Sequence, residues 1–227
     1  MVASQSRLDL IAHNLANAST TGYKEDRVDF SEALERTLMS GGAEIGSLGV
    51  GPVESQRFIS GELGNIIETH NPLDVAISHV EGAFAVQTPQ GIRYTRNGAF
   101  SLNADKEIVT QQGYPVLDER NSPIRITQEG KIIIDDLGVI TVDGQEMGRF
   151  GIFHSNNFEK VGESLMKADD TVIASVQIKS NSLEQSNVSP IEAMIDLIKV
   201  GRLYEMGQKI IQAEDESSSK LIEGLRS

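Results

Sequence analysis

The start of the chain carries apolar residues at helical spacing. Leu8, Ile11 and Leu15 recur three or four residues apart, with polar residues between them. This period places the apolar side chains on one face of a helix. The helix is expected to end within residues 17–22, because the run Asn-Ala-Ser-Thr-Thr-Gly consists of turn-forming residues. The periodic pattern is already under way at Met1, which predicts that the sequence starts partway through a helix.

The last fifty residues return to the helical pattern, and a shorter repeat follows the first helix. Phe30, Leu34 and Leu38, four residues apart, predict a second short helix. Near the other end, Pro190 suits the first turn of a helix. We expect a helix over about residues 189–222, far longer than the average of about 12 residues. Its apolar stripe comprises Ile191, Met194, Ile195, Ile198, Leu203, Ile210 and Ile211.

Between about residues 48 and 178, short apolar runs alternate with turn residues. Thr88-Pro89-Gln90-Gly91 has Pro second and Gly fourth, which predicts a turn and a hairpin between residues 83–87 and 92–95. Asn97-Gly98 is a further turn signal before an expected strand at 99–102. The other expected strands are residues 108–110, 114–117, 124–126, 131–134, 139–142 and 149–153. Short, closely spaced strands without helices between them indicate an antiparallel all-β domain.

These patterns predict a mostly β fold with helical ends. A helix as long as the last one needs another helix or another subunit to pack against, so we expect the two ends of the chain to lie side by side. The antiparallel domain would then be inserted between them. The predicted boundaries are 1–39 for the N-terminal helical segment, 40–182 for the β domain and 183–227 for the C-terminal helix. The β domain is expected to fold without the ends.

Composition excludes several classes of function. The 227 residues include 20 basic and 33 acidic ones, for a net charge of -13, which argues against partners such as nucleic acid or an anionic membrane. No cysteine is present, so disulfides, thiolate metal sites and cysteine nucleophiles are excluded. No apolar run approaches the roughly 20 residues of a membrane span. The N-terminus also lacks the basic and apolar regions of a cleavable signal peptide.

Candidate catalytic and metal-binding residues are not arranged for chemistry. None of the four histidines has a partner at metal-ligand spacing. Asn103, Asp105 and Glu107 mimic the start of a calcium loop, but Ile108 stands where that loop needs Gly, so a hairpin turn is expected. The adjacent acids Asp135-Asp136 would point to opposite faces of a strand. We therefore expect no catalytic residue, no metal, no cofactor and no small-molecule substrate.

Four segments are more specific than an amphipathic pattern requires. The first is residues 8–24, which contain Asn14 and Asn17 and end in Thr20-Thr21-Gly22-Tyr23-Lys24. The second is Leu183-Glu184-Gln185-Ser186-Asn187-Val188, followed by a helix containing Arg202-Leu203-Tyr204-Glu205. Two more lie in the predicted β domain, Asn71-Pro72-Leu73-Asp74-Val75-Ala76-Ile77 and Tyr94-Thr95-Arg96-Asn97-Gly98-Ala99-Phe100.

Together, and in this order, these segments resemble the signatures of the flagellar axial proteins, the rod and hook family. The chain is too short for a hook protein with its extra outer domains, so it resembles a rod protein. The segment 189–196 together with Glu205-Met206 is closer to the proximal than to the distal rod type. His13 stands where the family usually has Asn, and Lys106 stands near a common turn Gly.

The resemblance implies a function as a structural subunit. The terminal helices would form an inner coiled-coil layer of a tubular polymer in the basal body, and the β domain an outer layer, transmitting torque from motor to hook. The expected partners are copies of the chain, other rod and hook proteins, and the flagellar type III export apparatus. The residues expected to carry subunit and helix packing are Leu8, Ile11, Leu15, Asn17, Ile191, Met194, Ile195 and Ile198.

Three alternatives remain open from the sequence. A hook-type subunit belongs to the same family. A secreted β-domain module that binds carbohydrate or peptide would need an aromatic-lined concave site, against which the absence of Trp argues. A hydrolase with paired carboxylates would need convergent acids in a cleft.

Overall fold

The computed structural model describes residues 2–28, 57–155, 157–162, 164–174 and 176–226. Contacts divide the chain into two units. The helical unit consists of Met1–Ala16, Asp26–Arg57 and Ser189–Ser227, as far as these are described, and the β unit of Asn17–Glu25 and Phe58–Val188. The short helix expected around Leu34 lies outside the described residues, and so does the predicted boundary at residue 39.

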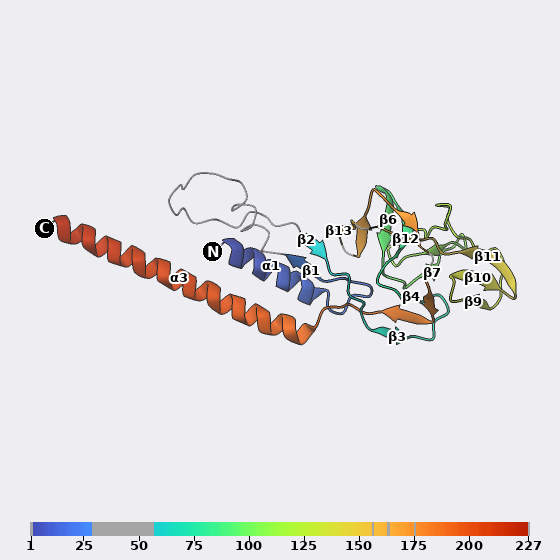
Figure 1. Ribbon diagram of the computed structural model, residues 1–227, viewed down its shortest axis with the longest axis horizontal. Helices are drawn as coiled ribbons and strands as arrows, with labels where there is room; N and C mark the ends of the chain where they lie inside the picture. The colour runs from blue at the N-terminus through green and yellow to red at the C-terminus, as the bar shows by residue number, and fades with distance from the viewer. Residues whose placement is uncertain (1, 29–56, 156, 163, 175, 227) are drawn as a thin grey trace. The chain divides into compact units, whose positions relative to one another are not determined.

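The helical unit contains the two predicted terminal helices. Helix α1 spans Val2–Ala16, and helix α3 spans Pro190–Arg226. Ser189 precedes α3 as its cap: its carbonyl accepts the Ala193 N–H at 3.0 Å and its hydroxyl the Glu192 N–H at 3.5 Å. The two helices contact each other and run in opposite directions (Figure 1). The expectation of a helix at each end of a mostly β chain is therefore confirmed.

A buried asparagine fixes the segment that follows in this unit. The Asn14 side chain on α1 donates to the Asp26 carbonyl at 2.9 Å and accepts the Asp26 N–H at 3.0 Å. Asp26 opens strand β1 (Asp26–Val28), so both backbone groups of its first residue are satisfied by one amide. The asparagine of the N-terminal motif thus serves local folding.

The β unit is antiparallel throughout the described pairings. Its largest sheet has six strands in the order β13-β14-β6-β5-β12-β15, and a second sheet has three in the order β11-β10-β9. Three further pairs are β7–β8, β16–β4 and β17–β3. The bounds are β2 Arg57–Ile59, β3 Ile66–Glu68, β4 Val75–Ile77, β5 Ala83–Thr88, β6 Gly91–Thr95, β7 Ser101–Leu102, β8 Ile108–Val109, β9 Ile132–Ile134, β10 Val139–Val142, β11 Gln145–Arg149, β12 Ile152–His154, β13 Glu159–Gly162, β14 Leu165–Lys167, β15 Val172–Ile173, β16 Ile178–Ser180 and β17 Ser182–Glu184.

Most predicted strands are confirmed. One of the exceptions shows how the chain passes from one sheet to the other. The hairpin β5–β6 closes with Thr88 opposite Gly91, as the turn sequence predicts. The expected strand 149–153 is instead split between β11 and β12. At the break, Gly151 N–H donates to Leu117 O at 2.9 Å, and an added Cβ on Gly151 would lie 2.4 Å from Asp118 O. The chain passes there from the three-stranded to the six-stranded sheet.

The expected strands 114–117 and 124–126 form isolated bridges instead of continuous ladders. Pro115 pairs with Val109, and Pro123 pairs with Leu117. Pro115 also lies beside β5, where its carbonyl accepts the Gln87 N–H at 2.8 Å. Proline has no N–H to donate in return, so the bridge between Val86 and Val116 cannot extend through this position.

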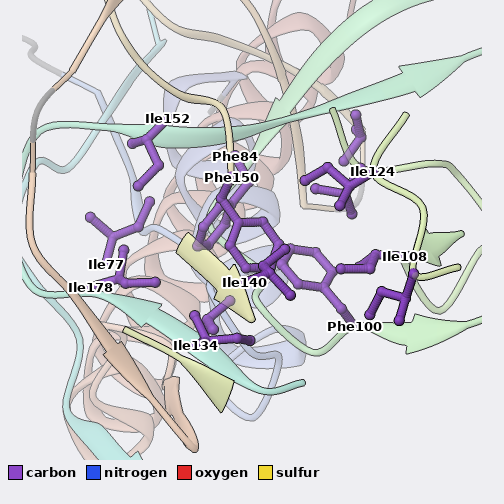
Figure 2. Close-up of a cluster of buried hydrophobic side chains, with 14 of the residues drawn as sticks. Ile77, Phe84, Phe100, Ile108, Ile124, Ile134, Ile140, Phe150, Ile152 and Ile178 are labelled. Atoms are coloured by element: carbon purple, nitrogen blue, oxygen red, sulfur yellow. The ribbon is translucent and has the colours of Figure 1, made fainter. Parts of the chain in front are cut away.

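The interior of the β unit is filled by branched aliphatic and phenylalanine side chains. Phe84, Phe100 and Phe150 lie at the centre of the main cluster (Figure 2). Their ring centroids are 5.2–5.6 Å apart. Aromatic pairs at this spacing contribute beyond simple burial. Isoleucines from several strands surround them, so the core joins the six-stranded and three-stranded sheets into one unit.

The structure requires glycine at residue 98 for a reason other than the turn that the sequence suggests. Asn97-Gly98 does not form the two-residue loop of a hairpin. Instead, Val75 N–H donates to Gly98 O at 3.1 Å, and a Cβ on Gly98 would lie 1.7 Å from Val75 O. Glycine is needed there because two backbones approach each other, which brings the two predicted β-domain motifs into direct contact.

This close approach predicts the effect of one methyl group. Gly98→Ala should lower the free energy of unfolding of the β unit by about 2 kcal/mol or more, since the backbones must separate to accept the Cβ. Gly61→Ala is the matched control, because its Cβ would meet only the Val80 side chain at an ordinary 3.6 Å. Urea unfolding of both variants tests this, and equal midpoints for the two would contradict it.

Candidate functional site: the free face of the C-terminal helix and the motif junction

Helix α3 has two apolar faces. The half-buried and buried positions Ala193, Leu197, Val200 and Tyr204 recur at helical spacing and form one face. Val200, at 5% exposure, is the most enclosed of them. Since α1 contacts α3, we assign this face to intramolecular helix packing.

The predicted packing residues of α3 lie on the other face. Ile191, Met194, Ile195 and Ile198 are 71%, 52%, 47% and 53% exposed, respectively. We call these four residues the free face. A helix in a monomeric protein normally turns its apolar stripe toward a core, so an exposed stripe of this kind marks an interaction surface.

The predicted packing residues near the N-terminus are placed differently. Leu8, Ile11 and Leu15 are half-buried on α1. Asn17 follows the helix in a turn, where its carbonyl accepts the Thr20 N–H at 3.0 Å and its side chain accepts the Thr20 hydroxyl at 3.2 Å. Asn17 is counted with the β unit, so the structure does not bring all eight predicted residues onto one surface.

A cluster of three charged side chains lies inside the β unit. Glu184 has no exposed surface, and its Oε1 lies 2.5 Å from Lys24 Nζ. Arg96 Nε lies 3.3 Å from the other oxygen, Oε2. We call Lys24, Arg96 and Glu184 the motif junction, because one residue comes from each of three motifs: the N-terminal, the second β-domain and the C-terminal one.

The junction compensates its charges in several ways. Lys24 also donates to Glu62 O at 2.7 Å, and Gly64 N–H donates to Glu184 Oε1 at 3.0 Å. No hydrogen bond reaches Glu184 Oε2 among the described residues, so the nearby Arg96 charge is what offsets this oxygen. A buried carboxylate would be costly without such partners.

Arg96 extends the junction to a neighbouring turn. Its guanidinium donates to Gly82 O at 2.8 Å, His79 O at 2.7 Å and Val80 O at 3.1 Å. The planar fork of arginine suits three carbonyls of one turn in a way that lysine would not. This turn leads directly into β5, so the junction is tied to the centre of the six-stranded sheet.

Backbone geometry at Gly22 depends on the same junction. Gly22 has φ 67°, and a Cβ there would lie 2.4 Å from the Arg96 carbonyl carbon. Its N–H donates to Glu184 O at 2.8 Å. The glycine of the N-terminal motif is therefore required by the position of the other two motifs.

Tyr23 and Lys160 hold the same segment from the other side. Lys160 Nζ lies 3.8 Å from the centroid of the buried Tyr23 ring and donates to the Lys24 carbonyl at 2.5 Å. Lys160 belongs to β13, at an edge of the six-stranded sheet. The N-terminal motif is thus fixed to both the junction and the sheet edge.

Burial shifts the ionisation of both cations. Loss of hydration lowers the pKa of Lys24 below its ordinary value of 10.5, and the Glu184 carboxylate partly offsets this. Burial likewise lowers the pKa of Arg96, again opposed by Glu184. The Glu184 carboxylate therefore favours the charged form of Lys24 and opposes the effect of lost hydration.

The sequence motifs contained these three residues without indicating their roles. The spacing of 72 and 88 residues between them carries no periodic signal. The only hint was that Lys24, Arg96 and Glu184 each lie within a segment more specific than its secondary structure requires.

A hollow among the described residues lies distant in sequence from the terminal motifs. It has a volume of about 490 Å³ and is lined by His79, Glu81, His154 and the apolar Val172 and Ile173, among others. His154 Nδ1 lies 3.9 Å from Glu81 Oε2. No group of three or more His, Asp or Glu side chains in the described part of the chain is placed to hold a metal ion. Asn103 and Glu107 form a hairpin turn, with Glu107 N–H donating to Asn103 Oδ1 at 2.8 Å, as expected.

Neither described helix is long and apolar enough to cross a membrane.

Three family models match the chain. The model for the flagella basal body rod protein matches residues 1–24, that for the flagellar hook protein FlgE/F/G D1 domain matches 79–142, and that for the flagellar basal body rod FlgEFG protein C-terminal matches 179–223. Each of the three contains one residue of the motif junction.

Curated proteins match over nearly their whole length. The flagellar basal-body rod protein FlgG of Agrobacterium fabrum is 34% identical, with 100% of this chain and 96% of that protein covered. FlgF of Mesorhizobium japonicum is 32% identical, with 100% and 94% covered, and FlgG of Bacillus subtilis is 30% identical, with 96% and 93% covered. Relatives with both names match at similar identity, so the proximal type stays a prediction. The secreted-module alternative is not favoured by these matches.

The contacts of the motif junction predict which of two substitutions destabilises the β unit more. Glu184→Gln leaves two buried cations without their anion and should cost about 3–5 kcal/mol of unfolding free energy. Lys24→Met leaves Glu184 paired with Arg96 and should cost less, about 1–3 kcal/mol. Chemical denaturation of the β unit measures both, and a larger loss for Lys24→Met would show that the charge balance is misassigned.

The same variant predicts a pH dependence. Without Glu184 the pKa of Lys24 should fall further, so unfolding takes up a proton between that lowered pKa and the ordinary 10.5. Stability in this range then rises with pH, and the stability deficit of Glu184→Gln relative to wild type should narrow as the pH rises toward 10.5. A deficit that stays constant or widens over this range would argue against a buried, charged Lys24.

Proposed function

The chain belongs to the family of flagellar basal-body rod proteins, and on that premise we propose that it assembles into the rod through the free face of α3. As a rod subunit it is a structural protein of the flagellar basal body, and its partners are flagellar axial proteins. The observation that carries the assembly mechanism is the exposure of Ile191, Met194, Ile195 and Ile198, which is about half or more for each.

The physical reasoning concerns what an exposed apolar stripe does in a polymer. Each large aliphatic side chain removed from water contributes about 1.5–3 kcal/mol. Four of them on one helix face form an association surface, which gains this free energy only when another subunit covers it. A contact between this face and a different surface of the next subunit generates an open filament, whereas a self-complementary contact stops at a dimer.

The remaining details belong to the same proposal. Helices α1 and α3 of neighbouring subunits pack as a coiled-coil inner layer, with Leu8, Ile11 and Leu15 contributing to the helix pair and Asn17 to the turn that follows it. The β unit forms the outer layer. The subunit is exported by the flagellar type III apparatus, and the assembled rod transmits torque.

A single charge on the free face tests this. Ile195→Asp places a carboxylate in the proposed subunit contact, where burial without a partner would cost several kcal/mol. The β unit should be unaffected, because Ile195 lies in the other unit and distant substitutions act independently. We expect a thermal transition within about 2 °C of wild type, with loss of incorporation into rods and of swimming motility.

The matched control adds the same charge elsewhere on the helix. Gln208 is exposed and lies outside the free face, so Gln208→Asp should support assembly and motility. Circular dichroism, sedimentation of basal bodies and a motility assay compare the two variants. Motile cells carrying Ile195→Asp, or equal failure of both variants, would contradict the role of the free face.

A further inference from the structure

The chain passes between its two units at four points, and the segments that do so are linked inside the β unit. The crossings lie at residues 16–17, 25–26, 57–58 and 188–189. Any force that the helical unit delivers along the covalent chain therefore enters the β unit through three segments: Asn17–Glu25, the segment beginning at Phe58, and the segment ending at Val188.

The first and last of these segments are bonded side by side. Gly22 N–H donates to Glu184 O at 2.8 Å, and Asn187 N–H donates to Tyr23 O at 3.4 Å. Glu25 N–H donates to Asn187 Oδ1 at 2.7 Å. These bonds lie on both sides of the Lys24–Glu184 ion pair.

The middle segment is bonded to both of the others. Ser60 N–H donates to Glu25 O at 2.9 Å, and Glu62 O accepts from Lys24 Nζ at 2.7 Å and from Asn187 Nδ2 at 3.1 Å. Gly64 N–H donates to Glu184 Oε1 at 3.0 Å. All three connecting segments thus meet at Lys24 and Glu184.

We propose that the motif junction is a mechanical clamp, which joins the three connecting segments to one another and anchors them in the sheet. The anchor is Arg96, which links Glu184 to the carbonyls of the turn before β5. Because Lys24 and Glu184 are enclosed by protein, water cannot readily replace their bond while it is under tension. The clamp rests on the proposed function in one respect: a subunit that transmits torque has to resist force at this place.

The clamp differs from an ordinary stabilising contact in its directionality. A contact that only stabilises the β unit slows unfolding whichever residues are pulled. A clamp on the connecting segments slows unfolding most when the load enters through those segments, because the load then acts directly on its bonds.

Single-molecule force spectroscopy on the full chain separates these two roles. The sequence has no cysteine, so handles can be attached at introduced cysteines without side reactions. In one arrangement the handles are at the two chain ends, so that tension reaches the β unit at Asn17 and Val188. In the other they replace Asp105 and Asp170, two exposed turn residues within the β unit.

Lys24→Met should raise the unfolding rate of the β unit at a fixed force by at least about tenfold more under end loading than under internal loading. Arg125→Met, which removes an exposed ion pair with Glu107, should change neither rate. Ile140→Val, a core truncation, should raise both rates equally. Equal effects of Lys24→Met in the two arrangements, or no effect in either, would overturn the clamp.

A milder variant keeps the test valid if Lys24→Met does not fold. Asn187→Ala removes only the bonds from Glu25 N–H and to Glu62 O, and it should show the same excess under end loading. Because the measurement uses isolated molecules, it does not depend on assembly. Failure of the clamp therefore leaves the rod assembly proposal intact, and failure of the free-face variant leaves the clamp intact.

Discussion

A single buried carboxylate determines how three distant parts of this chain come together. Glu184 is fully enclosed, so it needs cations that are enclosed with it. Lys24 supplies one from the N-terminal motif and Arg96 supplies the other from the second β-domain motif. Satisfying this one charge places the N-terminal motif against the C-terminal motif and fixes both to the six-stranded sheet. The glycine at residue 22 and the turn before β5 are consequences of the same arrangement.

In the proposed assembly, the two units have different tasks. The β unit has an aromatic and aliphatic core of its own, whereas the helical unit exposes the free face on α3. The exposed apolar surface of one copy can contact another copy. The motif junction is buried, so its charges can only stabilise the fold of the subunit itself. The motif junction binds the segments that join the two units. The stability of the β unit and its connection to the helical unit therefore depend on the same residues.

The sequence predicts much of this fold and little of the junction. Periodicity locates both helices, and turn chemistry locates the β5–β6 hairpin, because these signals are local. It fails at residues 114–117 and 124–126, which form isolated bridges instead of ladders, and at Gly98, whose need for glycine comes from the backbone of Val75. The boundaries predicted at residues 40 and 182 would exclude both Lys24 and Glu184, because an ion pair that spans 160 residues leaves no local signal. The exposed free face follows from the apolar stripe, although only the structure distinguishes it from the face containing Val200.

Native-state hydrogen exchange of the Gly22 and Gly64 amides tests the central role of Glu184 most directly. Both N–H groups donate to Glu184, one to its carbonyl and one to its carboxylate, from segments that are 42 residues apart in the sequence. If the junction holds the β unit together, both amides should exchange only through global unfolding, with the same free energy of opening as core amides such as that of Ile108. Exchange of either amide through a local opening several kcal/mol below the global value would contradict the account.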